Sequence, residues 1–403
     1  MLKHTAIYIS NLENKKELLK KINTGMLFPE VLNLKEGVLS DIALKSFIEK
    51  EIRYERSHIQ TKTSNSLKNS SEGERKKALL NHILKHQPEY VLLDNVFDCL
   101  DIKSQSDIEN KLFQLRNEFV IIQITTRKRD LLPFIDVIYN YEKGELKAYD
   151  NNFENKNNYF INHLPKPYKN IAEINNPIIS LKNINLSYGE RQILRNISWE
   201  IKPSEFWQLI GPNGSGKSTL LSLISGDNPK GYSEDMTLFG MKKGSGESVW
   251  DIKKHIGFFS SEMLLGFRRP DTIENMIISG FLDSIGLYKH PTDIQINIAH
   301  KWLDVLNMFN IKDKSFQSLA NGHKRLVLIA RAMVKHPSLL ILDEPTNGLD
   351  DNDAVLLAQL VNKICKETNT AILYVSHRKE ANITPDYIFE LIPSQEGSTG
   401  AIV

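Results

Sequence analysis

The most specific structural signal in this chain is WQLIGPNGSGKSTLLSLISG, from Trp207 to Gly226. An apolar run leads into a glycine-rich turn, and an apolar segment of helical character follows at once. Glycines allow successive backbone N–H groups to face an anion at the positive end of the following helix. This order predicts a phosphate-binding loop between a strand and a helix of an α/β domain with a parallel sheet.

The predicted loop supplies the candidate nucleotide ligands. Lys217 is expected to reach the β- and γ-phosphates, and the hydroxyl of Ser218 is expected to bind Mg²⁺. The alternative is a glycine-rich turn that binds nothing, which the flanking strand and helix disfavour. The candidate ATP-binding residues in this loop are Gly211, Pro212, Asn213, Gly214, Ser215, Gly216, Lys217, Ser218 and Thr219.

Two further motifs end apolar runs in the second half. LLILDEP ends its run at Asp343 and Glu344, and AILYVSH ends at His377. Parallel sheets expose their ligand sites at these strand ends. Asp343 is therefore predicted to bind the metal, Glu344 to act as the base for an attacking water, and His377 to contact the γ-phosphate. The alternatives are acids that simply close a strand and a histidine satisfied in the core.

An internal repeat divides the chain. The stretch from Leu319 to Asp350 aligns without a gap with the stretch from Ser70 to Asp101, and TAILYVSHRKE later matches FVIIQITTRKRD. Self-similarity at long spacing indicates repeated domains, and an Asn-rich, aperiodic stretch with prolines separates the two copies. We therefore expect a first domain over 1–150, a linker over 151–177 and a second, complete domain over 178–403.

Composition is consistent with this division and excludes several classes of protein. The 403 residues correspond to two or three domains of roughly 150 residues each. No apolar run is long enough to span a bilayer, and no signal peptide is recognised, so a cytoplasmic location is predicted. The 51 basic and 49 acidic residues nearly balance, and Cys99 and Cys365 suggest neither a disulfide framework nor a zinc site.

These motifs together resemble the ATP-binding cassette (ABC) ATPase family over nearly the whole second half, Ile178 to Ile392. The resemblance implies two tandem P-loop-type nucleotide-binding domains that use ATP and Mg²⁺, the N-terminal one truncated and degenerate. It also implies that Tyr188 stacks on adenine; an ordinary strand aromatic is the alternative.

The second copy departs from the family pattern at two places. Where the family keeps its LSGGQ signature, Leu319–His323 has Ala320 and Asn321 in place of Ser and the middle Gly. Where the family keeps a switch-loop glutamine, this chain has Ser261, which we retain as a candidate metal ligand.

The first copy has lost more. No phosphate loop precedes its part of the repeat. Asn95 stands where the second copy has Glu344, the predicted base, and Thr126 stands where it has His377. Ser71 and Gly73 nevertheless keep the hydroxyl and one glycine of the signature, which predicts contact with ATP. The alternative is a simple helix cap.

Family members sandwich ATP between the loop of one cassette and the signature of another. The resemblance therefore implies intramolecular pairing of the two halves, which would form two composite sites. Only one of them would work, because the sequence losses described above fall on the second site. The alternative is dimerisation of chains through identical second halves.

A closer match concerns the process that ATP drives. The stretch from Gly226 to Met263 resembles the tandem-cassette, ModF-like proteins associated with molybdate transport, which implies the ATPase of an oxyanion transport system. The insert from Glu262 to Phe316 would contact membrane permease subunits, placing the protein at the inner face of the cell membrane, and Arg268 and Arg269 would serve there unless they are solvated. A ribosome or nucleic-acid partner is less favoured, and the basic run Arg127–Arg129 is interpreted as a solvated turn. A weakly hydrolysing, ATP-responsive regulator is the third class.

Overall fold

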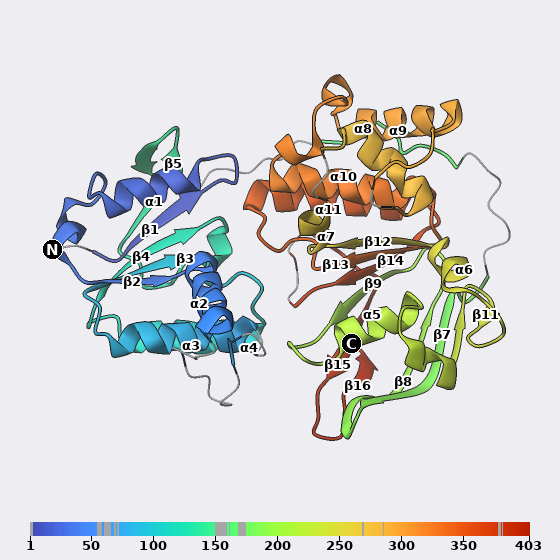
Figure 1. Cartoon of the computed structure of the whole chain (residues 1–403), viewed down its shortest axis with the longest axis horizontal. Helices are drawn as coiled ribbons and strands as arrows, with labels where there is room; N and C mark the ends of the chain where they lie inside the picture. The colour runs from blue at the N-terminus through green and yellow to red at the C-terminus, as the bar shows by residue number, and fades with distance from the viewer. Residues whose placement is uncertain are drawn as a thin grey trace. The chain divides into compact units, whose positions relative to one another are not determined.

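The computed structural model describes residues 3–54, 59, 66–67, 70, 72–149, 159–160, 162–167, 175–267, 270–284, 286–377, 380 and 382–403. The chain forms two compact units, and each is described by itself (Figure 1). Unit 1 comprises Met1–Lys156 with Asn347–Asn352, and unit 2 comprises Asn157–Thr346 with Asp353–Val403.

Unit 2 is built on two sheets. The larger has the order β12-β13-β14-β9-β15-β16, in which all neighbours are parallel except β15 and β16. The smaller is antiparallel with the order β11-β10-β7-β8. The strands are β7 (Ile179–Tyr188), β8 (Arg191–Ile201), β9 (Phe206–Ile210), β10 (Asp235–Leu238), β11 (Met241–Lys242), β12 (Ile256–Ser260), β13 (Leu339–Asp343), β14 (Ala371–Val375), β15 (Tyr387–Ile392) and β16 (Thr399–Ile402).

Helices cover both faces of the larger sheet, as Figure 1 shows for α5 on one side and α10 and α11 on the other. Its central strands are continuous apolar runs, because parallel strands covered on both faces must bury every side chain. The α-helices are α5 (Lys217–Ile224), α6 (Val249–Lys253), α7 (Met263–Gly266), α8 (Ile273–Ile278), α9 (Asp293–Val305), α10 (Asn321–Met333) and α11 (Asp351–Glu367), and the 3-10 helices are η4 (Pro229–Ser233), η5 (Ser279–Leu282), η6 (Phe309–Ile311) and η7 (Phe316–Ser318).

Unit 1 repeats the larger sheet. Its order is β2-β3-β4-β1-β5-β6, again parallel except for the last pair. Among its described residues no second sheet accompanies this one. The elements are β1 (Thr5–Ile9), α1 (Lys15–Asn23), η1 (Pro29–Asn33), β2 (Glu36–Leu39), α2 (Asp41–Tyr54), α3 (Glu72–Lys85), β3 (Tyr90–Asp94), α4 (Ile102–Gln114), β4 (Val120–Thr125), η3 (Lys128–Asp130), β5 (Val137–Glu142) and β6 (Glu145–Ala148).

The two sheets correspond strand by strand, with β1 in the place of β9 and β2 in the place of β12. The backbone agrees even where the sequence does not. Asn95 has a φ of 44° where Glu344 has 48°, and Cys99 has 59° where Gly348 has 69°. Positive φ is uncommon for residues other than glycine, so these shared values show a retained backbone. The prediction of an α/β fold is confirmed.

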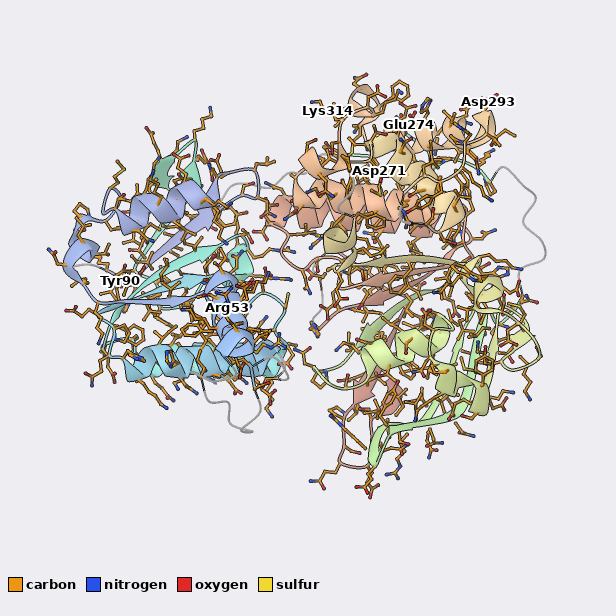
Figure 2. The ribbon with its side chains drawn as sticks, in the orientation of Figure 1. Arg53, Tyr90, Asp271, Glu274, Asp293 and Lys314 are labelled. Atoms are coloured by element: carbon orange, nitrogen blue, oxygen red, sulfur yellow. The ribbon has the colours of Figure 1, made fainter. Side chains whose placement is uncertain are left out.

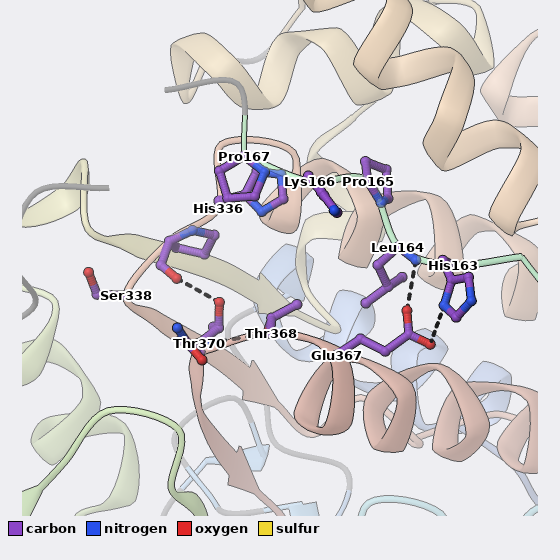
Figure 3. A pocket seen from close by; sticks show the side chains of 12 residues that line it. His163, Leu164, Pro165, Lys166, Pro167, His336, Ser338, Glu367, Thr368 and Thr370 are labelled. Atoms are coloured by element: carbon purple, nitrogen blue, oxygen red, sulfur yellow. Dashed lines mark hydrogen bonds and ion pairs between the residues drawn. The ribbon is translucent and has the colours of Figure 1, made fainter. Parts of the chain in front are cut away.

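The stretch predicted as a linker packs partly on unit 2. Phe160 is buried, and the backbone N–H of Leu164 donates to the carboxylate of Glu367 at 2.8 Å. This segment lines a cavity of about 350 Å³ together with His336 and Thr370 (Figure 3). The cavity lies beside the residues that precede β13 and β14, at the amino-terminal ends of these strands. The phosphate loop lies at the opposite, carboxyl-terminal end of the parallel strands. The compact unit 2 includes this segment and begins at Asn157, while the predicted linker over 151–177 and second domain over 178–403 stay predictions.

Candidate functional site

The predicted phosphate loop connects β9 to α5 in unit 2. Gly216 precedes the helix with a φ of 93°, a conformation that favours glycine. A Cβ at this position would also approach Leu194 of β8 to 2.9 Å. Glycine is therefore required both by the turn and by the β-hairpin that packs against it.

Lys217 is buried at the first position of α5, and its ammonium group donates to the carbonyl oxygens of Gly211 at 2.7 Å and Pro212 at 3.1 Å. Ser218, the next residue, is exposed. The hydroxyl of Ser215 is buried without a hydrogen-bond partner among the described residues. The loop thus presents an ammonium, a hydroxyl and an unsatisfied buried hydroxyl around one turn, which suits an oxygen-rich anion.

The acidic residues lie at the end of β13. The pKa of Asp343 is raised to about 6, first by burial and then by the negative charge of Glu344, while the charge of Lys217 opposes the shift. The backbone N–H of Glu344 donates to the carbonyl of Val375 at 2.9 Å. The structure thereby brings Lys217, Asp343 and Glu344 together.

His377 follows β14, and its Nε2 contacts the carboxylate of Glu344 as an ion pair when the ring is protonated. Its Nδ1 is buried without a partner among the described residues. This arrangement favours the predicted role at the acidic end of the site over a fully satisfied core histidine, since one ring nitrogen remains available.

Ser261 lies just beyond β12, and its hydroxyl donates to the backbone carbonyl of Glu344 at 2.5 Å. In this arrangement the hydroxyl proton is directed to the main chain. Its oxygen retains lone pairs, so the predicted metal role remains a proposal.

Tyr188 ends β7 and is 48% exposed. Its hydroxyl accepts a hydrogen bond from Asn228 at 2.9 Å, and the ammonium of Lys230 lies 5.0 Å from the ring centre. An exposed aromatic ring fixed at its rim is suited to stacking. Asn228 and Lys230 carry no motif, so sequence reasoning missed them.

The glycine of each signature segment packs closely against a second helix of its own unit. A Cβ on Gly73 would approach Ser104 Oγ to 2.6 Å, and one on Gly322, its repeat counterpart, would overlap the carboxylate of Asp353. Close approach of two helices therefore accounts for glycine at both positions. Ser71 lies outside the described residues, and Ala320 provides no side-chain cap for α10. Contact of Ser71 and Gly73 with ATP stays a prediction.

The donor set fits Mg²⁺. The ion prefers oxygen ligands and is commonly held by one or two carboxylates together with substrate phosphates. Asp343 would provide the carboxylate and Ser218 the hydroxyl, and the raised pKa of Asp343 is that of a carboxyl group that gains from a nearby cation. ATP phosphates would complete the ligand set.

The Asp343→Asn variant should be more stable than the parent protein at neutral pH without nucleotide. Because folding raises the pKa from 3.8 to about 6, the folded state binds more protons in that interval, and stability falls as pH rises from about 4 to 6. Ionisation of Asp343 in the folded state at pH 7 costs about 3 kcal/mol, which the amide avoids. Chemical denaturation at pH 5 and 7 measures this. The exposed Asp313→Asn change is the control, and a less stable Asp343→Asn protein at pH 7 contradicts the expectation.

The helical insert carries charged side chains, of which Asp293 and Lys314 are exposed. Figure 2 labels Asp271, Glu274, Asp293 and Lys314 on it. Glu274 contacts His300 and lies 3.4 Å from Lys312, so part of this charge is paired within the insert. Arg268 and Arg269 lie outside the described residues. Every helix in the described part of the chain is too short or too polar to cross a membrane.

The predicted solvated turn at Arg127–Arg129 differs from the structure. Arg127 is only 5% exposed, because its guanidinium donates a hydrogen bond to the carbonyl of Leu349 and forms an ion pair with Asp351, both in unit 1. A run of three basic residues gives no sequence signal that distinguishes the buried member from the others.

Comparisons with known proteins agree with this geometry. Residues 194–347 match the family model described as ABC transporter. The ABC transporter ATP-binding protein ModF of Escherichia coli is 41% identical over 77% of this chain and 67% of its own length. An uncharacterized ABC transporter ATP-binding protein of Schizosaccharomyces pombe is 30% identical over 78% of this chain and 66% of its own. The uncharacterized ABC transporter ATP-binding protein YmeB of Lactococcus lactis is 37% identical over 55% of this chain and 84% of its own.

Proposed function

Since this chain belongs to the family of ABC transporter ATP-binding proteins, we propose that it hydrolyses ATP at a single composite site and drives a transport system. The chain spans about two thirds of the length of the first two relatives. An oxyanion as the transported solute rests on the resemblance within Gly226–Met263.

The convergence of Lys217, Asp343, Glu344 and His377 at one end of the unit 2 sheet carries the proposal. Lys217 would bind the phosphates, and Asp343 with Ser218 would hold Mg²⁺, which neutralises phosphate charge when bound. Glu344 would accept a proton from the attacking water, and His377 would hold the position of Glu344 and contact the γ-phosphate. Tyr188 would stack on adenine.

The second half of the composite site is proposed from the repeat. Ser71 and Gly73 of the first copy would face the phosphates bound by Lys217, because the first copy retains these signature residues while the second has Ala320 and Asn321. In the first copy Asn95 and Thr126 replace the base and the histidine, so unit 1 would not hydrolyse ATP on its own.

Fractionation of cells that express Glu344→Gln tests the transport role. With ATP and Mg²⁺ the variant should sediment with membranes through permease subunits, and a Lys217→Ala control should lose this association because it cannot hold the phosphates. Recovery with ribosomes would overturn the proposal. A wholly soluble protein with tight ATP binding and negligible turnover would replace it with a nucleotide-responsive regulator.

A further inference from the structure

Unit 1 retains the position of a phosphate loop but not its chemistry. The turn Ser10–Asn14 connects β1 to α1, as Gly211–Gly216 connects β9 to α5. It contains no glycine, and Asn14 caps the helix by accepting from the N–H of Glu17. The turn therefore closes on its own helix instead of opening its N–H groups around a phosphate.

In unit 1, the residues that correspond to the phosphate-binding lysine and the metal-binding aspartate form an ion pair with each other. Lys15 begins α1 as Lys217 begins α5, and Asp94 ends β3 as Asp343 ends β13. Lys15 Nζ forms an ion pair with the carboxylate of Asp94, which is 7% exposed. The cation that would meet a phosphate is thus neutralised by the carboxylate that would meet a metal.

Other polar groups of the turn bind a side-chain carboxylate of this same chain, that of Asp350. The hydroxyl of Ser10 and the backbone N–H of Asn11 each donate to Oδ2 of Asp350 at 2.8 Å, and the side-chain amide of Asn11 donates to the carbonyl of Gly348 at 3.2 Å. Asp350 lies in the segment 347–352, which belongs to unit 1. A carboxylate therefore occupies the N–H and hydroxyl donors of this turn.

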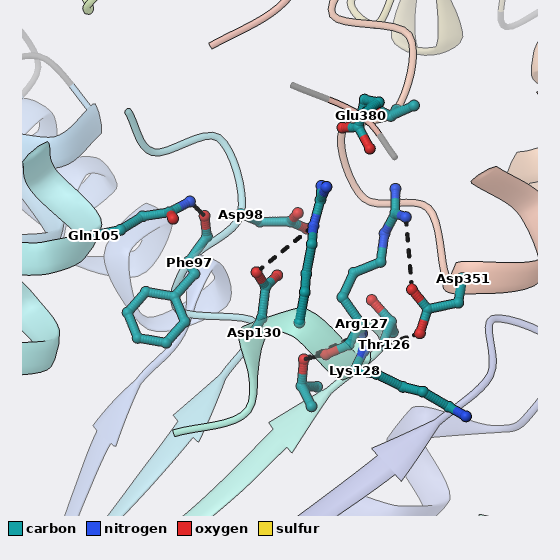
Figure 4. Close-up of polar contacts among 12 residues, drawn as sticks. Phe97, Asp98, Gln105, Thr126, Arg127, Lys128, Asp130, Asp351 and Glu380 are labelled. Atoms are coloured by element: carbon teal, nitrogen blue, oxygen red, sulfur yellow. Dashed lines mark hydrogen bonds and ion pairs between the residues drawn. The ribbon is translucent and has the colours of Figure 1, made fainter. Parts of the chain in front are cut away.

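Arg127, which lies two residues beyond the end of β4, holds the same segment. Its Nε donates to the carbonyl of Leu349 at 2.7 Å, and its Nη1 lies 3.7 Å from the carboxylate of Asp351 (Figure 4). The backbone N–H of Lys128 donates to Asp351 at 2.9 Å, and the hydroxyl of Tyr8 donates to it at 3.2 Å. Side chains and main chain at the ends of two strands, β1 and β4, thus converge on segment 347–352.

We propose that unit 1 has exchanged nucleotide binding for peptide binding. Its former nucleotide site, defined by Ser10, Asn11 and Arg127, is a cradle that holds segment 347–352 without ATP. Because this segment begins three residues after Glu344, the cradle fixes the chain that follows the proposed base, and Arg127 is a positioning residue for hydrolysis. Only this effect on turnover rests on the proposed function.

Hydrogen exchange of the full-length protein without nucleotide tests the cradle directly. Amides of 347–352 should be protected in the parent protein, and Arg127→Met should raise their exchange by about tenfold or more, as expected for a lost buried hydrogen bond from a charged donor. Lys128→Met is the matched control, because it removes the neighbouring charge and keeps the backbone N–H that binds Asp351. Arg127→Lys tests for partial rescue.

Turnover and nucleotide binding complete the test. Arg127→Met should lower kcat at unchanged ATP affinity, and calorimetry should find one ATP bound per chain. Unprotected amides in the parent protein, equal exchange in Arg127→Met and Lys128→Met, or a second ATP that survives Lys217→Ala would each overturn the proposal. If the parent protein lacks ATPase activity while the exchange difference persists, the proposed function fails and the cradle stands.

Discussion

The Glu344→Gln variant should hydrolyse ATP about a hundredfold to ten-thousandfold more slowly, the range typical of a lost general base, and should retain bound ATP. Glutamine keeps the size of the side chain but cannot accept the proton of the attacking water. The backbone N–H of residue 344 donates to the carbonyl of Val375 at 2.9 Å, a hydrogen bond that does not involve the side chain. The substitution should therefore change catalysis without changing the local backbone structure. Single-turnover hydrolysis and retention of labelled ATP measure both effects.

Glu396→Gln is the matched control for that experiment. Glu396 is exposed and pairs with Arg195 on the surface of unit 2, so its turnover should equal that of the parent protein. Rapid hydrolysis by Glu344→Gln would remove the assignment of the base, and another carboxylate near Asp343 would have to be sought.

Ser71→Arg should abolish turnover almost completely, whereas Ala320→Arg should leave it near the parent value. In a single composite site, ATP held by Lys217 meets the signature of the first copy, and a bulky side chain there would block closure. Ala320 would face only the eroded site, where no ATP binds. Steady-state ATPase assays of the two variants, with ATP affinity measured in parallel, give the comparison.

The same pair of variants distinguishes the alternative assembly. If chains dimerise through identical second halves, every working site depends on Ala320, so Ala320→Arg would abolish turnover and Ser71→Arg would spare it. Equal loss in both variants would contradict the single-site proposal as well. Thermal denaturation of each variant serves as the folding control.

Sequence reasoning placed the glycine turn between a strand and a helix, and the acids at a strand end, as the structure has them, because both are local signals. It identified the repeat only from Ser70 onward. The strand counterparts β1 and β2 were missed, since the turn after β1 has lost every glycine and no motif marks its position. Pairing of Lys15 with Asp94 was equally invisible, because ion pairs between distant elements depend on sheet order rather than on spacing.

Other differences arise from burial. Phe160 and Leu164 anchor a stretch whose composition is typical of a linker, because two apolar side chains are enough to attach an otherwise polar segment. Arg127 is buried within a run that composition alone assigns to solvent. In both cases the tertiary partners decide the outcome, and those partners are distant in sequence.

The assignment of 347–352 to unit 1 makes that unit discontinuous along the chain. A fragment that ends at Lys156 would lack the peptide that satisfies Ser10, Asn11 and Arg127, and it would expose a cationic, hydrogen-bonding surface. Proteolysis within 151–156 would likewise leave the larger piece still carrying a segment of the smaller unit. The two repeats are therefore expected to behave as one folding unit rather than as separable modules.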